Sequence, residues 1–120
     1  MNTGLACFPL ADLESLPFEA GAPAAARIVD GDPRTRTWIF NESTDGKTFA
    51  GVWDATPGAW RIAYDEWEYC CILSGISEIV PDDAPPFRVK AGDHFVIEPG
   101  LTGLWRVIET TRKSFVVRLP

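Results

Sequence analysis

Apolar and polar residues alternate in short runs from residue 36 onward. In one run Trp60, Ile62 and Tyr64 share one face of the predicted strand, with an arginine and an alanine between them, because successive strand side chains point to opposite faces. Clusters of Gly, Pro and Asp separate the runs, and no segment keeps the helical period of about 3.6 residues. The pattern predicts an all-β domain. The runs expected to form strands, some with a following turn, are 36–42, 48–55, 59–64, 68–75, 76–80, 87–93, 94–100, 104–110 and 113–119.

The first 35 residues have a different character. Prolines and a stretch of small residues at 21–26 interrupt any regular pattern, and only 11–16 has the composition of a helical turn. We expect an irregular lead-in over 1–35 and a single barrel domain over 36–120. A chain of 120 residues is long enough for one hydrophobic core. Closing the sheet into a barrel is the common way to protect strand edges at this size.

The charge of the chain narrows the choice of partners. The net charge is −6 and the isoelectric point is about 4.6, whereas nucleic-acid binding depends on clustered Lys and Arg. We expect no nucleic-acid partner. No apolar run approaches the roughly 20 residues of a membrane-spanning helix, so no membrane association is expected. The N-terminal region lacks a basic stretch, and Asp12 and Glu14 interrupt its apolar residues, so we expect no secretory signal.

Three cysteines, Cys7, Cys70 and Cys71, do not make a disulfide framework. Cys70 and Cys71 are neighbours in a predicted strand, so their side chains point to opposite faces and cannot easily hold one ion together. We interpret them as small buried residues of a protein in a reducing compartment. Together with the missing secretory signal, this predicts a cytoplasmic location.

Two segments, 51–75 and 90–115, carry turn and strand residues in a fixed order. Those of the first are Gly51-Val52-Trp53, Thr56-Pro57-Gly58, Tyr64, Glu68, Cys70, Leu73 and Gly75, and those of the second are Gly92-Asp93, Pro99-Gly100, Gly103, Trp105 and Arg112-Lys113. Their order and spacing resemble the two halves of a cupin, in particular the subgroup of ethanolamine-utilisation cupins and ureidoglycine aminohydrolase domains. The resemblance implies a single antiparallel, jelly-roll-like cupin barrel.

The same resemblance implies which residues would hold a metal ion. Glu68 stands at the glutamate of the first cupin motif, with six residues between it and Gly75. The three positions of the usual cupin histidines are Ile62, Tyr64 and Gly103. A catalytic transition-metal site needs about three N, S or O donors. We therefore expect no metal and no cofactor, and the activities of metal-loaded cupins, ureidoglycine aminohydrolase included, are not carried over.

His94, the single histidine, is not at a cupin ligand position. We expect it to be a partly exposed residue of a strand.

Strand alternation predicts which side chains enter the barrel. Glu68 and Lys113 are the candidate catalytic residues, because a carboxylate and an ammonium in a partly dry pocket perturb each other's pKa. They could equally be a structural ion pair, and the tryptophans could be core or interface residues. The other residues expected to line the pocket are Tyr64, Cys70, Trp105, Trp60 and Ile62.

Two functions follow from this pattern. In the first, the barrel holds a metal-independent pocket for a small molecule, as a weak enzyme or a sensor. Glu68 is then the base or hydrogen-bond acceptor, Lys113 its electrostatic partner, and Tyr64 and Trp105 are walls. In the second, the chain is a non-catalytic dimeric accessory domain with a vestigial pocket. We expect a homodimer in either case, because five tryptophans and an apolar lead-in exceed the needs of one small core, and two-fold dimers are the commonest closed assembly.

Overall fold

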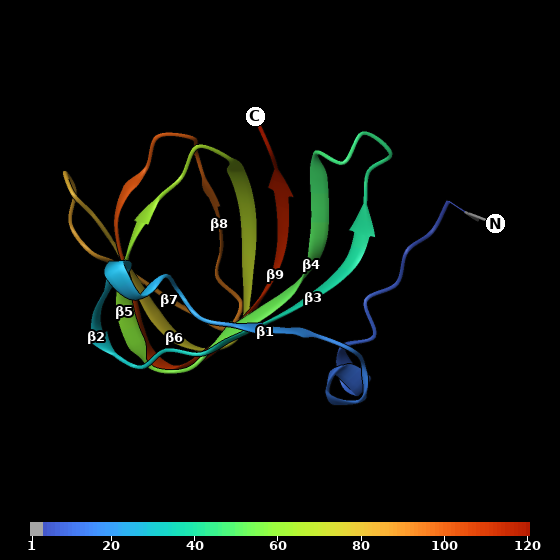
Figure 1. Ribbon diagram of the computed structural model, residues 1–120, viewed down its shortest axis with the longest axis horizontal. Coiled ribbons are helices and arrows are strands. Elements are labelled where there is room, and N and C mark those ends of the chain that lie inside the picture. The colour runs from blue at the N-terminus through green and yellow to red at the C-terminus, as the bar shows by residue number, and fades with distance from the viewer. Residues whose placement is uncertain (1–3) are drawn as a thin grey trace.

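Nine antiparallel strands and two short 3-10 helices form residues 4–120, the part of the chain that the computed structural model describes (Figure 1). The all-β prediction is confirmed. Residues 1–3 of the predicted lead-in lie outside the described residues. In chain order the elements are η1 (Leu10–Ser15), β1 (Glu19–Gly21), η2 (Ala25–Arg27), β2 (Ile28–Gly31), β3 (Thr35–Glu42), β4 (Thr48–Ala55), β5 (Gly58–Ala63), β6 (Trp67–Pro81), β7 (Phe87–Lys90), β8 (His94–Ile97) and β9 (Thr102–Arg118).

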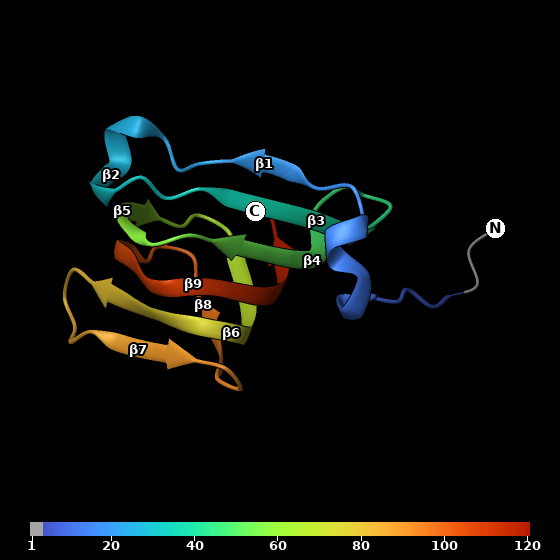
Figure 2. The same ribbon diagram turned by 90° about the horizontal axis from the view of Figure 1, so that it is seen from below.

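Strand β9 organises the sheet. Its C-terminal half pairs with β4 and its N-terminal half with β5, while β6 pairs along nearly the whole of its other edge. Beyond these, β3 and then β1 follow β4, β2 follows β5, and β7 and β8 pair with successive parts of β6. Figure 2 shows β1, β3, β4, β9, β6 and β7 side by side across one face. The sheet curls around its inner face into the predicted cupin-type barrel.

Strands β6 and β9 are each continuous, whereas the alternation pattern predicted a break in each of them that would divide it into two strands. In β6 the predicted break at residues 75 and 76 is a bend, because the register with β9 shifts between Ile72 and Ser77. Gly75 lies in this stretch with a φ of 88°. A Cβ atom there would collide with the carbonyl group of Thr110 on β9. Glycine at a β-bulge thus lets the two long strands bend together without ending.

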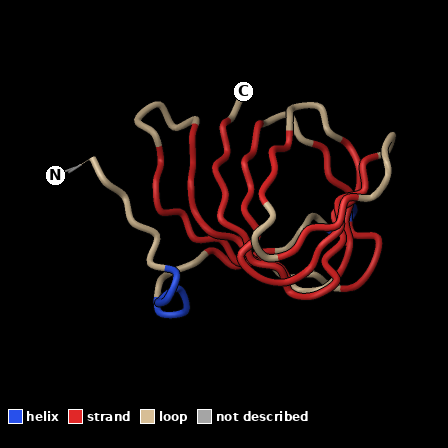
Figure 3. The backbone as a smooth tube through the Cα atoms, turned by 180° about the vertical axis from the view of Figure 1, so that it is seen from behind, coloured by secondary structure: helices blue, strands red, loops and turns tan. Residues whose placement is uncertain are grey.

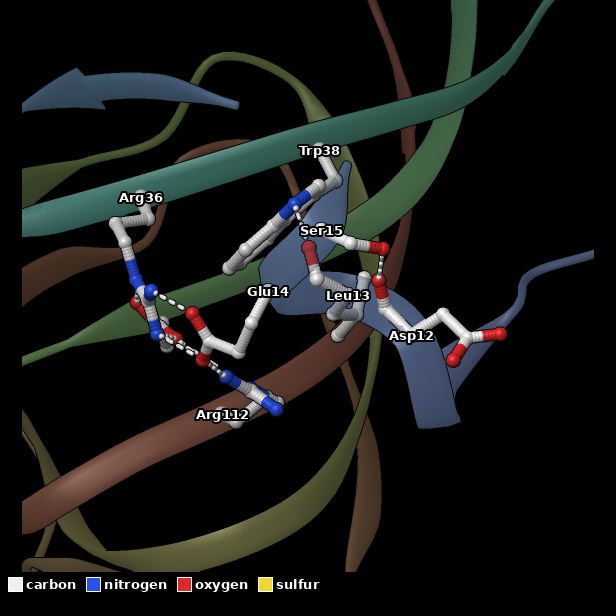
Figure 4. A network of polar contacts seen from close by, with 8 residues as sticks. Asp12, Leu13, Glu14, Ser15, Arg36, Trp38 and Arg112 are labelled. Atoms are coloured by element: carbon white, nitrogen blue, oxygen red, sulfur yellow. Dashed lines mark hydrogen bonds and ion pairs between the residues drawn. The ribbon is translucent and has the colours of Figure 1, made fainter. Parts of the chain in front are cut away.

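The lead-in packs on the outer face of the sheet. Helix η1 matches the helical turn predicted at 11–16 and lies outside the curled sheet (Figure 3). Leu13 is buried against Trp38 and Val52, and its carbonyl oxygen accepts a hydrogen bond of 3.1 Å from Trp38 Nε1 (Figure 4). The lead-in was expected to be irregular, but it also supplies β1 and β2, which pair with β3 and β5.

A charged cluster reinforces this contact. Glu14 of η1 receives hydrogen bonds from Arg36 on β3 and Arg112 on β9 (Figure 4). Both arginines also bond the buried Asp54 of β4 and lie over the ring of Trp38. The cluster therefore ties the lead-in to three strands of the barrel. No helix within residues 4–120 has the length and apolar composition needed to cross a membrane.

Candidate functional site

A cavity of about 270 Å³ lies on the inner face of the curled sheet. Five of the strands, or the residues next to them, contribute to its wall, because alternate residues of each strand point inward. On β6, for example, Glu68 is buried while its neighbours in the chain are only partly buried. Aromatic rings make up most of the wall. The residues that line the cavity are Thr37, Trp53, Trp60, Tyr64, Glu68, Trp105, Lys113, Phe115 and Val117.

Glu68 and Lys113 form an ion pair at this cavity. The distance between Lys113 Nζ and Glu68 Oε2 is 2.9 Å, and each residue is 5% exposed. The ammonium group also lies 4.6 Å from the ring centroids of Trp53 and Trp105, within the range of cation–π attraction. Its remaining contact is with Cys70 Sγ at 3.7 Å. Lys113 is thus held by a carboxylate and by two aromatic faces.

Burial determines the protonation states around this pair. It raises the pKa of the Cys70 thiol to about 12 and raises the pKa of Tyr64 well above its usual value. For Lys113, burial lowers the pKa, but the Glu68 carboxylate beside the ammonium raises it, and the net shift is upward. At neutral pH Lys113 is therefore a cation, while Cys70 and Tyr64 are uncharged.

The indole N–H of Trp105 is buried and has no hydrogen-bond partner. Its side chain is 1% exposed. Among residues 4–120, its Nε1 is the one buried side-chain nitrogen or oxygen atom without a hydrogen-bond partner. An indole N–H only donates, and buried polar groups in folded proteins are nearly always paired. The Trp105 ring therefore lines the cavity, while its N–H is enclosed by protein atoms.

The strands that build the cavity also match a known protein family in sequence. A profile of the EutQ-like cupin domain matches residues 42–115, which is more than half of the chain. The chain belongs to the EutQ-like cupin family. The predicted resemblance to ethanolamine-utilisation cupins is confirmed, whereas kinship with ureidoglycine aminohydrolase stays a prediction. No curated protein matches the chain in sequence.

Solved structures of other cupins share the fold of this EutQ-like cupin. A DUF861-family protein of unknown function from Pseudomonas syringae pv. tomato superimposes with a TM-score of 0.77 at 20% identity, over 85% of this chain and 44% of that chain. The Cnp3 cupin domain of Schizosaccharomyces pombe gives 0.65 at 16% identity, covering 90% and 72%. The EutQ protein of Clostridium difficile gives 0.64 at 12% identity, covering 95% and 85%. This chain thus spans less than half of the Pseudomonas protein, and such identities indicate the fold alone.

The side chains of this EutQ-like cupin do not fit the metal site that the cupin resemblance implies. Ile62 has no donor atom, and Gly103 has no space for a side chain, because a Cβ atom there would collide with the Val80 carbonyl oxygen. Glu68, the retained ligand position, is bound to the Lys113 ammonium. Within residues 4–120 no three His, Cys, Asp or Glu side chains come together as a metal-binding group. The ammonium group of Lys113 is thus the cation beside Glu68.

The residues predicted from the sequence lie in one region, but not all of them line the cavity. Glu68, Lys113, Tyr64, Trp105 and Trp60 do. Cys70 and Ile62 belong to the core cluster next to the cavity. Cys70 contacts Lys113, and Ile62 lines an adjoining hollow that shares Trp60 and Tyr64 with the cavity.

Four further residues line the cavity, and of these Thr37 and Trp53 were not predicted. Phe115 and Val117 alternate with Lys113 along β9, so strand parity was a sufficient signal for them. Thr37 and Trp53 are directly paired across β3 and β4, and this pairing is visible only in the folded sheet. His94 is exposed, as predicted, and its Nδ1 lies 3.2 Å from the Tyr69 hydroxyl.

Proposed function

We propose that this EutQ-like cupin binds a small organic molecule inside its barrel without a metal ion. The observation that carries the proposal is the buried ion pair of Glu68 and Lys113, placed between two tryptophan rings at the wall of the cavity. Concave, largely apolar cavities with a few fixed polar groups are the usual sites of small ligands. Glu68 serves as hydrogen-bond acceptor or base, and Lys113 as its electrostatic partner.

The protonation states favour binding, as in a sensor, over covalent catalysis. A nucleophile must be deprotonated to attack, yet the raised pKa values of Cys70, Tyr64 and Lys113 keep all three protonated at neutral pH. The Glu68 carboxylate at the cavity wall offers hydrogen-bond acceptors. The protein is therefore proposed to recognise its ligand through hydrogen bonds and aromatic contact. Its unpaired cysteines suit a reducing compartment such as the cytoplasm.

A thermal-shift screen with a library of small metabolites tests the proposal. The screen is run with and without a chelator, because metal-free binding must survive the chelator. A ligand that binds only the folded state raises the melting temperature. We expect at least one compound to do so in the wild type and to lose its effect in Thr37→Phe, which fills the cavity.

Thr44→Phe is the matched control, because Thr44 is exposed in the turn between β3 and β4. Its response to the same compound should equal that of the wild type. A screen in which every shift disappears with the chelator contradicts the proposal, and so does a shift that Thr37→Phe leaves intact.

We also propose that the protein is a homodimer, as the cupin resemblance implies. Two apolar side chains on neighbouring strands support this. Phe87 on β7 is 55% exposed and Val96 on β8 is 45% exposed. Both line a second hollow, whose wall is nearly all apolar. Exposed apolar side chains that gather in this way are typical of contact surfaces.

A further inference from the structure

Arg27 is a cation without a counter-ion in the described part of the chain. Most arginines here form ion pairs with carboxylates, namely Arg34, Arg36, Arg61, Arg88, Arg106 and Arg112. Arg118 lies over the ring of Trp67 instead. Arg27 has neither kind of contact within residues 4–120: its Nη1 lies 3.5 Å from the Arg61 carbonyl oxygen, a long hydrogen bond. Most of its five N–H donors are therefore available.

Arg27 lies in the wall of the adjoining hollow, which has a volume of about 290 Å³. It ends the short helix η2 (the light-blue coil in Figure 1), and its contact with the Arg61 carbonyl holds the guanidinium against β5. Arg61 lines the same hollow, but its Nη2 bonds both carboxylate oxygens of Asp82 at 2.9 Å. Of the two arginines in this wall, Arg27 is thus the one whose charge is available to a ligand.

The cavity and the adjoining hollow differ in charge. In the cavity, Glu68 and Lys113 cancel each other at a separation of 2.9 Å, and both are buried. An added anion would compete with Glu68 for the ammonium, and an added cation would compete with Lys113 for the carboxylate, while either would lose its hydration. The part of a ligand that enters the cavity should therefore be uncharged.

The adjoining hollow can take a negative charge. Arg27 is exposed, so an anion beside it keeps part of its hydration, and a planar guanidinium matches a carboxylate with two parallel hydrogen bonds. Glu66 also lines the hollow, and its carboxylate would repel a second negative charge. The hollow shares the rings of Trp53, Trp60 and Tyr64 with the cavity, so one ligand can contact both spaces.

We infer, on the basis of the proposed binding function, that the ligand is a monocarboxylate with an uncharged, largely apolar body. The body lies in the cavity against the shared aromatic rings, and the carboxylate pairs with Arg27 in the adjoining hollow.

Three probes with the same body test this inference: 4-phenylbutyrate is an anion, 4-phenylbutyramide is uncharged, and 4-phenylbutylamine is a cation. Titration calorimetry gives the dissociation constant of each. We expect the acid to bind about tenfold more tightly than the amide, the value of one charge-assisted contact at an exposed site. The net charge of −6 attracts the amine and repels the acid, so a preference for the acid must come from a local cation. The preference should shrink at high salt, because Arg27 is exposed.

Arg27→Gln should weaken binding of the acid about tenfold and leave binding of the amide unchanged. Arg88→Gln is the matched control, because it removes the same charge from an exposed arginine on β7 that lines neither space. It should retain the preference for the acid. Thr37→Phe fills the cavity and should weaken binding of both compounds, because their common body lies there.

The outcomes separate this inference from the proposed function. Equal binding of acid and amide to the wild type, or a preference for the acid that survives Arg27→Gln, overturns the carboxylate contact and leaves the binding function in place. Binding of the acid that Thr37→Phe leaves intact contradicts both proposals. If none of the three probes binds, the inference is overturned, and the metabolite screen still decides the proposed function.

Discussion

Lys113 occupies the centre of the candidate site, and its charge is the feature on which the site depends. The ammonium is fixed by Glu68 and by the faces of Trp53 and Trp105. The protein's own cation stands beside a buried carboxylate that would otherwise be uncompensated. Removing one partner would leave a buried charge alone.

Single substitutions of this pair are expected to be costly. Glu68→Gln or Lys113→Met alone should lower the free energy of unfolding by about 3–5 kcal/mol, and the double variant should recover much of the loss. Urea denaturation of all four proteins gives the coupling energy. The pair of Arg61 and Asp82, also 2.9 Å apart but each with a side chain 47% exposed, is the control, with a coupling of at most about 1 kcal/mol. Additive effects of a few tenths of a kcal/mol at Glu68 and Lys113 would mean that the two charges do not stabilise each other.

Cys70 gives the site a characteristic dependence on pH. The thiol titrates near 9.0 in the unfolded chain and at about 12 in the folded protein. Above pH 9 the unfolded state therefore binds fewer protons, and stability falls as the pH rises. Between about pH 8 and about pH 10 this costs roughly 1 kcal/mol in the free energy of unfolding. Cys70→Ala should remove that part of the loss, as measured by urea denaturation at several pH values. Identical slopes of the free energy of unfolding against pH in the two proteins would refute the assignment.

Alternation along the strands was enough to predict most of the site residues. Glu68 and Lys113 are far apart in the sequence, yet parity directed both side chains to the same face. Parity could not show that Cys70 is fully covered by its neighbours in the core cluster. Nor could it place Thr37 opposite Trp53, because that contact depends on the register of β3 and β4.

At the scale of the elements, the long strands β6 and β9 were predicted least well. Glycine and small polar residues near residue 75 have the composition of a turn, and the sequence pattern was interpreted in that way. In the folded protein Gly75 instead makes a bulge at which both strands bend. A turn and a bulge use the same residue type, and only the pairing with β9 distinguishes them.

Two glycines with similar backbone conformations test this explanation. Gly75 and Gly92 have φ of 88° and 94°, so alanine costs about 1–2 kcal/mol at either position from backbone strain. At Gly75 the methyl group also meets the Thr110 carbonyl, whereas nothing lies within 4 Å at Gly92. Gly75→Ala should therefore be less stable than Gly92→Ala by a further 1–3 kcal/mol or so. Equal losses in thermal or urea unfolding would show that β6 and β9 are not closely packed at the bend.

For the whole molecule, the prediction of a single all-β cupin barrel is confirmed, and several of its tryptophans are buried within one subunit. Trp38, Trp60 and Trp105 are buried within the chain, and Leu13 of the lead-in packs on Trp38. Three of the five tryptophans are thus used inside one subunit, whereas Leu5, Leu10 and Phe18 of the lead-in are exposed. The proposed dimer contact is at Phe87 and Val96, which are also exposed.

Light scattering at tens of micromolar protein measures the oligomeric state. We expect a mass of twice 13.2 kDa and a shift toward the monomer in Phe87→Asp, because a charge at an apolar contact is costly. Ile39→Asp is the control, since Ile39 is 51% exposed on β3, away from β7 and β8. A wild-type protein that is monomeric at this concentration rules out the dimer.

The central claim is that the barrel binds an organic ligand without a metal. Diffraction from crystals grown with a compound from the thermal-shift screen, recorded at the absorption edges of manganese, iron, nickel and zinc, tests it most directly. The account predicts density for the compound inside the cavity lined by Trp60, Tyr64 and Trp105, and no anomalous peak beside Glu68. An anomalous peak at Glu68 that disappears in Glu68→Ala would contradict it, as would a compound bound only outside the barrel.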